Sequence, residues 1–223
     1  MMDTSQPHDR LRQDRILVCH AMVSITELPC EIVAMVLGNL DHLRYLSPAL
    51  LACRHFYTSF KESHGVEASI LCRQITPALL PHAVAVMEAS RLPRPLVDSS
   101  ALGLLDELYR SPPRLAARMH ALPPPVLRIM SCTHDAIHAL ATGFATRAQE
   151  LIPSGTSGTV LSPTENFRFC RAFYRVELFY SVFRDGGFDD KMQPWFFSRH
   201  PPWENEQLAS VYEYLEERFA RGE

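Results

Sequence analysis

Lysine is nearly missing from this chain, and so are several other features that mark common protein classes. Only Lys61 and Lys191 are lysines among 223 residues, and no run of basic residues occurs. A surface that follows nucleic-acid phosphates needs such a run, so the sequence argues against nucleic-acid binding. No stretch approaches the roughly 18 uninterrupted apolar residues of a membrane helix, so we expect no membrane span.

Paired cysteines are absent as well. The six cysteines stand singly in the chain, with no CxxC pair among them. Single cysteines on apolar helix faces act as small hydrophobic residues. We therefore expect a reduced protein of the cytoplasm and/or nucleus, with no disulfide, structural metal or cofactor. We interpret residues 1–24 as a flexible tail, and its acidic residues Asp3, Asp9 and Asp14 argue against a mitochondrial leader.

Alternating strand patterns and fixed-period repeats are also missing, whereas apolar residues at helical spacing are frequent. The 47% hydrophobic and 21% charged residues are values typical of a globular protein. Together with prolines at helix starts, these patterns predict an all-α protein of about eight to ten helices.

The stretch 28–60, which begins LPCEIVAMVLGNL, organises the N-terminal part of the chain. Pro29 suits the first position of a helix, where its missing N–H is not needed. The aliphatic residues then recur on two neighbouring helix faces, Ile32, Val36 and Leu40 on one and Val33 and Leu37 on the other. Two apolar faces on so short a helix predict two contacts, one with its own domain and one elsewhere.

A second and a third short helix follow. The segment HLRYL is expected to form a helical turn with Leu43 and Leu46 pointing inward. Ser47-Pro48 resembles a cap and a first helical position, so the third helix is predicted to begin there and to run to Phe60. Three helices in about 35 residues are too few for a self-sufficient core, so this module must pack on something else.

These residues resemble an F-box. The resemblance rests on Leu-Pro, the acidic Glu31, the aliphatic residues at helical spacing and the late CRHFY at residues 53–57. It implies a three-helix module over 25–62 that docks on the adaptor subunit of an SCF-type cullin–RING ubiquitin ligase, and through it on a cullin scaffold. The chain would then be a non-catalytic substrate receptor for a target protein that the sequence does not identify.

The resemblance also implies which residues contact the adaptor. They come from the first and third predicted helices, and are Leu28, Pro29, Ile32, Val36, Leu37, Leu40, Leu50, Leu51, Cys53 and Phe56. Cys30 and Pro48 depart from the family pattern. If residues 28–60 form an F-box, Leu28, Ile32 and Val36 should be exposed in the isolated chain, whereas Val33 and Leu37 should be buried. The alternative is an all-α interaction or structural domain with no ubiquitin connection.

The remainder, 63–223, is predicted to be an irregular helical domain that presents a target. Helices are expected after His64-Gly65, from Pro81, over 101–111 and 114–122, and over 126–152 as one long helix or two joined ones. The segments 91–100, 153–162 and 195–203 are expected to be loops.

The clearest helix start is Ser162-Pro-Thr-Glu165, a capping box with proline at the first helical position. The helix from there to Arg184 is apolar on most sides, so we expect it to be the most buried long helix. Gly186-Gly187 should end it. A last helix from Pro202 is predicted to place five apolar residues on one face, Leu208, Val211, Tyr212, Leu215 and Phe219.

The order of these segments, ending in PWENEQLASVYEYL, resembles a group of filamentous-fungal F-box-domain proteins across most of the chain. Members of that group are usually considerably longer, which indicates a shortened member or a truncated gene model.

The catalytic and metal-binding motifs that this sequence resembles are incomplete. His134 and His138 are four residues apart and could face one way on a helix, but further ligands and the base of an HExxH motif are missing. The Gly/Ser segment near residue 155 lacks the GK[ST] ending of a phosphate loop. No nucleophile, base and orienting group occur together, so we expect no catalytic residue.

Overall fold

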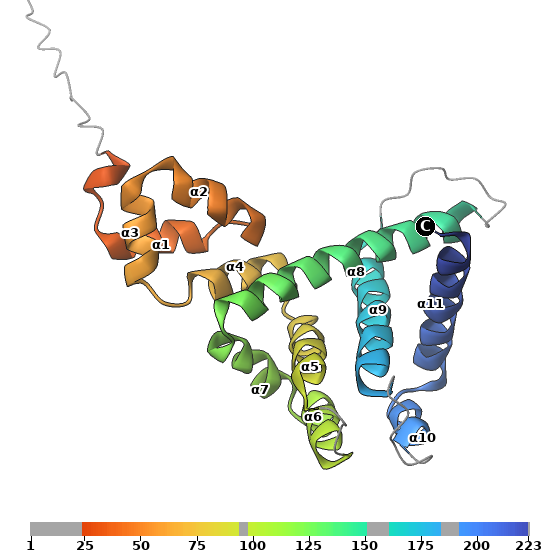
Figure 1. The fold of residues 1–223 in the computed structure, drawn as a ribbon. Coiled ribbons are helices and arrows are strands. Elements are labelled where there is room, and N and C mark those ends of the chain that lie inside the picture. The colour runs from red at the N-terminus through yellow and green to blue at the C-terminus, as the bar shows by residue number, and fades with distance from the viewer. Residues whose placement is uncertain (1–23, 94–97, 151–160, 184–191, 223) are drawn as a thin grey trace, which may run out of the picture.

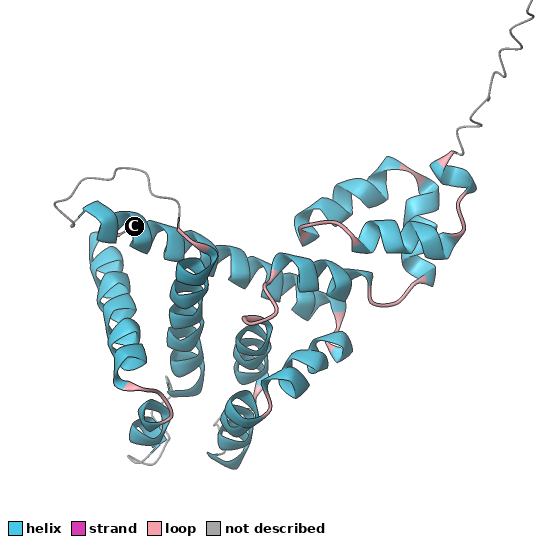
Figure 2. Ribbon diagram, turned by 180° about the vertical axis from the view of Figure 1, so that it is seen from behind, coloured by secondary structure: helices cyan, strands magenta, loops and turns pink. Residues whose placement is uncertain are grey.

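The structure, a computed structural model, describes residues 24–93, 98–150, 161–183 and 192–222. Every regular element in these residues is helical, which confirms the all-α class (Figure 2). The α-helices of the N-terminal part are α1 (Cys30–Gly38), α2 (Leu46–Ala52), α3 (Arg54–Glu62) and α4 (Val66–Gln74). Those of the remainder are α5 (Leu80–Arg91), α6 (Asp98–Arg110), α7 (Pro112–Ala117), α8 (Pro124–Glu150), α9 (Pro163–Phe183), α10 (Met192–Ser198) and α11 (Pro202–Arg221). Three short 3-10 helices, η1 (Ile25–Glu27), η2 (Leu43–Tyr45) and η3 (Arg118–Ala121), complete the described elements.

The long helix α8 runs along the molecule, and the other helices lie beside it (Figure 1). The module formed by α1, α2 and α3 lies at the end of the molecule where α8 begins. Helices α5, α6 and α7, and further along α9, α10 and α11, extend from the same side of α8. One helix or two joined helices were expected over 126–152, and the described residues up to Glu150 form the single helix α8.

Two hydrophobic clusters share helix α4. The module cluster contains Val33, Leu37, Leu43 and Leu46, together with Val66 and Ile70 of α4. The main core includes the other side of α4, with Ala68, Leu71 and Ile75, and continues through α5, α8, α9 and α11. The inward direction predicted for Leu43 and Leu46 is confirmed. Helix α4 therefore completes the hydrophobic core of the module and is also part of the core of the remaining helices.

The predicted boundaries within the module need correction. Helix α1 begins at Cys30, one residue later than predicted, because Pro29 is the N-cap whose carbonyl accepts the first helical bonds. The predicted third helix is two helices. Helix α2 already begins at Leu46, and Cys53 adopts extended backbone angles that separate it from α3. Pro48 therefore lies inside the first turn of α2 rather than at its start.

Helix α9 begins and packs as predicted. The Ser162 backbone N–H donates to Glu165 Oε2 at 2.8 Å, and the Glu165 N–H donates to Ser162 Oγ at 3.3 Å, which completes the capping box. The hydrogen bonds from Ser162 lower the pKa of Glu165. Ten residues of α9 are buried, more than in any other described helix, as expected for the central helix of this region.

Three other expectations were wrong. The described residues contain eleven α-helices instead of eight to ten. The segment 195–203, expected as an aromatic loop, begins inside α10, where Phe196 is fully buried, and ends inside α11. Helix α6 begins inside the expected loop 91–100. The tail before residue 24, most of the linker at 153–162, and Gly186-Gly187 lie outside the described residues.

Candidate functional site

An apolar stripe on the outer side of α1 is the candidate functional site. Ile32, Met35 and Val36 are 42%, 65% and 47% exposed, although they stand on a helix whose other side is closely packed. Val33 and Leu37 on that other side are buried in the module cluster. The predicted contrast between Ile32 and Val36 on one side and Val33 and Leu37 on the other is therefore present. We call Ile32, Met35 and Val36 the α1 stripe.

The Leu-Pro step before α1 is attached to α3. His55 Nε2 lies 2.9 Å from the carbonyl oxygen of Leu28 and donates a hydrogen bond to it. Leu28 itself is half-buried and packs against the module cluster, so the exposure predicted for it was wrong. This attachment orients the start of α1 and with it the α1 stripe.

The ten predicted contact residues divide into two groups. Those whose side chains pack into or against the module cluster are Leu28, Leu37, Leu40, Leu50 and Phe56. Those that are exposed are Pro29, Ile32, Val36 and Leu51. Cys53 is half-buried at the break between α2 and α3. Leu37 is only 2% exposed, which corrects its assignment as a contact residue, because the helical face it occupies is the one that builds the core.

Sequence reasoning missed Met35, although a signal for it was present. Ile32, Met35 and Val36 have the i, i+3, i+4 spacing of residues that share one helix face. Ile25, Tyr45 and Tyr57 are further exposed apolar residues of the module that were not predicted. Single exposed apolar residues are common, so only the three grouped on α1 carry an argument.

A cleft borders the α1 stripe on the side of α4. Its volume is about 640 Å³, and Met35 and Gly38 of α1 line it opposite Ser69 and Arg73 of α4. Met35 thus belongs both to the stripe and to the rim of the cleft.

A polar joint fixes the module to α8. His42 Nδ1 accepts a hydrogen bond from the Arg44 backbone N–H at 3.0 Å, so Nε2 carries the proton and donates to Asp135 Oδ1 at 2.8 Å. Gln74, at the end of α4, donates to the same Asp135 oxygen at 3.0 Å and accepts from Ser131 Oγ at 2.9 Å. One amide therefore connects the module, α4 and α8.

A second connection runs from α4 to α8. Glu67 is buried, and its Oε1 accepts hydrogen bonds from Arg128 at 3.2 and 3.3 Å. A buried carboxylate requires such a partner, because an unpaired charge in the interior is strongly destabilising. The orientation of the α1 stripe relative to the rest of the molecule is thus held by both polar contacts and the shared core.

A buried charged cluster lies at the other end of the molecule, between α9 and α11. Arg175 is 2% exposed, and its guanidinium donates to Glu204 Oε2 at 3.3 Å. Arg171 contacts the other Glu204 oxygen at 2.8 Å. His200 Nδ1 lies 3.4 Å from Glu204 Oε2, and its Nε2 accepts from the Tyr109 hydroxyl at 2.9 Å.

Burial sets the protonation of this cluster. Loss of solvent lowers the pKa of His200 to about 3, and the positive charge of Arg175 acts in the same direction. For the same two reasons, with Arg171 and Arg175 as the charges, the pKa of His82 is lowered to about 4. Burial raises the pKa of Tyr109 to about 12. Both pKa values lie well below 7, so both imidazoles are neutral at pH 7.

The histidine pair considered as metal ligands has another role. His134 is buried, and its Nδ1 lies 2.9 Å from the Tyr174 hydroxyl of α9. Burial lowers the pKa of His134. Within the described residues, no three His, Cys, Asp or Glu side chains gather in a way that could hold a metal ion. The described cysteines, from Cys30 to Cys170, are free thiols.

Comparison with protein-family models, with curated proteins and with solved structures finds no match to this chain. Among the described helices, not one combines the length and apolarity that crossing a bilayer would require.

Proposed function

We propose that this chain is a non-catalytic, F-box-type receptor subunit that docks on the adaptor of an SCF-type ubiquitin ligase through the α1 stripe. The observation that carries the proposal is the exposure of Ile32, Met35 and Val36 on a helix that follows the Leu-Pro step. Grouped apolar side chains on the surface of a globular protein usually mark a site for a partner. The CRHFY segment opens α3, which packs directly on α1.

The arrangement of the molecule suits a receptor that acts by proximity. The module lies at one end of α8, and helices α9 and α11 lie towards the other end (Figure 1). A target held by the distal helices would be kept near the conjugating enzyme that the adaptor and cullin bring. Holding two reactants on one assembly raises their effective concentration, so the receptor itself needs no catalytic group.

The test is co-purification of the full chain with the SCF adaptor, using Ile32→Ala/Val36→Ala as the variant. The two substitutions remove five methyl or methylene groups from the stripe and should weaken binding by about 2–4 kcal/mol, roughly 30- to 700-fold in Kd. Thermal stability should change little, because both side chains are already exposed. Ile129→Ala, at an exposed position of α8, is the matched control and should retain adaptor binding.

Two results would overturn the proposal. One is a wild-type chain that captures no adaptor at all, which would assign the α1 stripe to another kind of partner. The other is a stable double variant that captures the adaptor as well as the wild type does.

A further inference from the structure

Outside the module, exposed large apolar side chains concentrate on two neighbouring helices. Tyr180 of α9 and Trp203, Tyr212 and Phe219 of α11 are exposed, and Ile129 of α8 is the one other example among the described residues after 62. Because these side chains come from only two helices that pack on each other, the concentration requires an explanation beyond ordinary surface composition.

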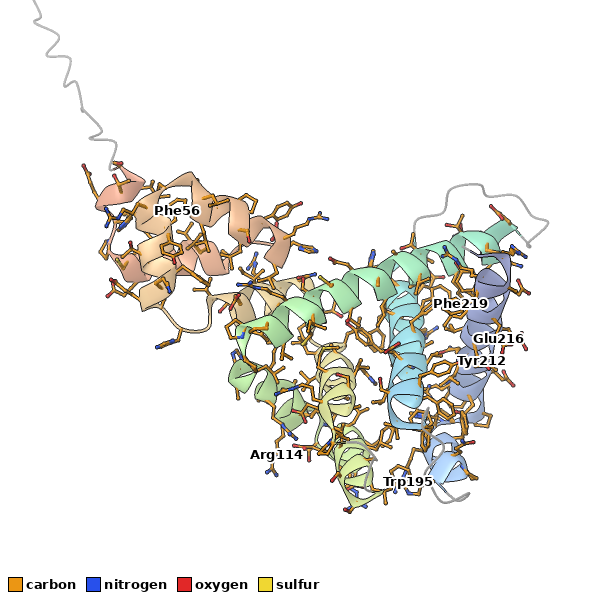
Figure 3. All side chains as sticks on the ribbon, viewed as in Figure 1. Phe56, Arg114, Trp195, Tyr212, Glu216 and Phe219 are labelled. Carbon is orange, nitrogen blue, oxygen red and sulfur yellow. The ribbon has the colours of Figure 1, made fainter. Side chains whose placement is uncertain are left out.

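Part of this set forms a continuous strip. Tyr212, Leu215 and Phe219 have the i, i+3, i+7 spacing of one helix face, and the ring of Tyr180 stacks on Tyr212 with centroids 6.1 Å apart. Tyr212 and Phe219 are 37% and 76% exposed, and Leu215 is half-buried. Figure 3 shows Tyr212 and Phe219 projecting from α11. We call Tyr180, Tyr212, Leu215 and Phe219 the α11 strip.

The α11 strip widens the apolar face by which α11 joins the main core. Leu208, Val211 and Tyr214 are the buried residues of this helix, and Leu215 packs against the same core, whereas Tyr212 and Phe219 at the edge of this face are exposed. A surface helix needs apolar side chains only where it faces the core. Phe219 in particular contributes little to the core in this position, so its exposure indicates a contact outside the chain.

Acidic side chains border the strip. Glu216 lies at its edge, one turn after Tyr212, and hydrogen-bonds to the Tyr212 hydroxyl, which raises the pKa of Tyr212. Glu213 lies one turn before Glu216 on the same side of α11, and Glu177 lies one turn before Tyr180 on α9. Both are exposed, and no ion pair joins Glu177, Glu213 or Glu216 to another described residue. Two arginines of the last turn of α11 have other partners, since Arg221 contacts Glu217 and Arg218 lies over the Tyr214 ring.

We propose that the α11 strip binds an amphipathic helical segment of a partner protein that carries aliphatic residues on one face and Lys or Arg beside them. Complementary charges across an interface favour association, and like charges oppose it. The Lys or Arg side chains of such a partner would form ion pairs with Glu177, Glu213 and Glu216. A second copy of this chain would instead bring the same carboxylates together, so self-association through α11 is disfavoured. This proposal does not depend on whether the module binds an adaptor.

Two matched synthetic peptides test the proposal. Both are amphipathic helices with leucines at i, i+3, i+4 and i+7, and they differ only in having lysine or glutamate at the flanking positions. Fluorescence anisotropy with the full chain should show at least about tenfold tighter binding of the lysine peptide. The preference should shrink at high salt, because exposed charges are screened.

Variants of the chain connect the result to the strip. Phe219→Ala should weaken the lysine peptide about tenfold without affecting folding, because this ring is mostly exposed. Glu213→Lys with Glu216→Lys should reverse the preference towards the glutamate peptide. Ile129→Ala should leave both peptides unchanged. Equal affinity for the two peptides, or an affinity for the lysine peptide that Phe219→Ala leaves unchanged, would overturn the proposal. So would a dimer in sedimentation velocity that Phe219→Ala dissociates, because a second copy would then occupy the strip.

Discussion

At the level of single residues, the chain uses aromatic side chains for two opposite purposes. Phe173 is 3% exposed and contacts the rings of Phe144 and Tyr214 edge to face. Phe219, in the same region of the molecule, has most of its ring in solvent. The first ring stabilises the fold and the second is available to a partner.

Replacing the two rings should separate these roles. Phe173→Ala should cost about 3–5 kcal/mol of folding free energy, because the neighbouring helices cannot close the cavity that it leaves. Phe219→Ala should change stability by less than about 0.5 kcal/mol. Urea unfolding followed by circular dichroism measures both, and similar losses for the two variants would contradict this division.

The buried histidines predict how stability depends on pH. His82 and His200 have pKa values lowered to about 4 and about 3 by burial and nearby arginines, whereas a free histidine titrates near 6.5. The unfolded chain therefore binds more protons, so their contribution is fully present above about pH 6.5 and is lost as pH falls below it. Each should remove up to about 1.4 kcal/mol per pH unit between about 6 and 5.

Denaturant unfolding at several pH values checks this slope. His200→Gln should reduce the slope of this dependence, since one of the titrating histidines is removed. A protein whose unfolding free energy is constant from pH 7 to 5 would contradict the neutral, buried state of both rings.

At the level of elements, the prolines explain which helix starts were predictable. The first four N–H groups of an α-helix have no partner within it, so proline is tolerated throughout the first turn. Pro163 occupies the first position of α9, as the capping box indicated, but Pro48 and Pro194 are the third residues of α2 and α10. A proline alone does not reveal its position in the turn, so α2 began earlier than expected and α10 was missed.

Helix α11 shows a second case in which the helical spacing of apolar residues does not reveal which side chains are buried. Both Tyr212 and Tyr214 are compatible with an apolar helix face, but only Tyr214 is buried. Its hydroxyl approaches α8 so closely that a Cβ at Gly143 would lie 2.9 Å away. This contact joins residues about 70 positions apart in the chain, and spacing within one helix carries no information about it. The all-α class and the α9 core were predictable because they depend on local patterns.

The capping box of α9 gives a testable energy for one such local pattern. Ser162→Ala removes the acceptor for the Glu165 N–H and should cost about 1 kcal/mol of stability. Ser210→Ala, within α11, is the control and should be neutral or slightly stabilising, because alanine is the better helix former. Thermal unfolding distinguishes them, and equal midpoints for the two variants would be inconsistent with a functioning cap.

At the level of the whole molecule, Gln74 determines how rigidly the module is attached. Gln74→Ala removes the amide that contacts both Asp135 and Ser131 of α8. We expect faster hydrogen exchange at backbone amides near residues 43–46 and 131–135, and a loss of roughly 1–3 kcal/mol from buried groups left without partners. Gln207→Ala on α11 is the matched control. Unchanged exchange in both segments would mean that the shared core and the remaining contacts, His42 with Asp135 and Glu67 with Arg128, hold the module without Gln74.

The sharing of α4 between two cores also decides whether the module can be moved to another protein. A fragment that ends near residue 62 lacks Val66 and Ile70, so the inner faces of Val33 and Leu37 would meet water. Extending the fragment through α4 supplies those two residues but exposes Ala68 and Leu71 to solvent, although both belong to the main core. No single cut leaves both pieces with closed surfaces. The module is therefore not portable, and a chimaera that transplants it must also supply a surface that covers the far side of α4.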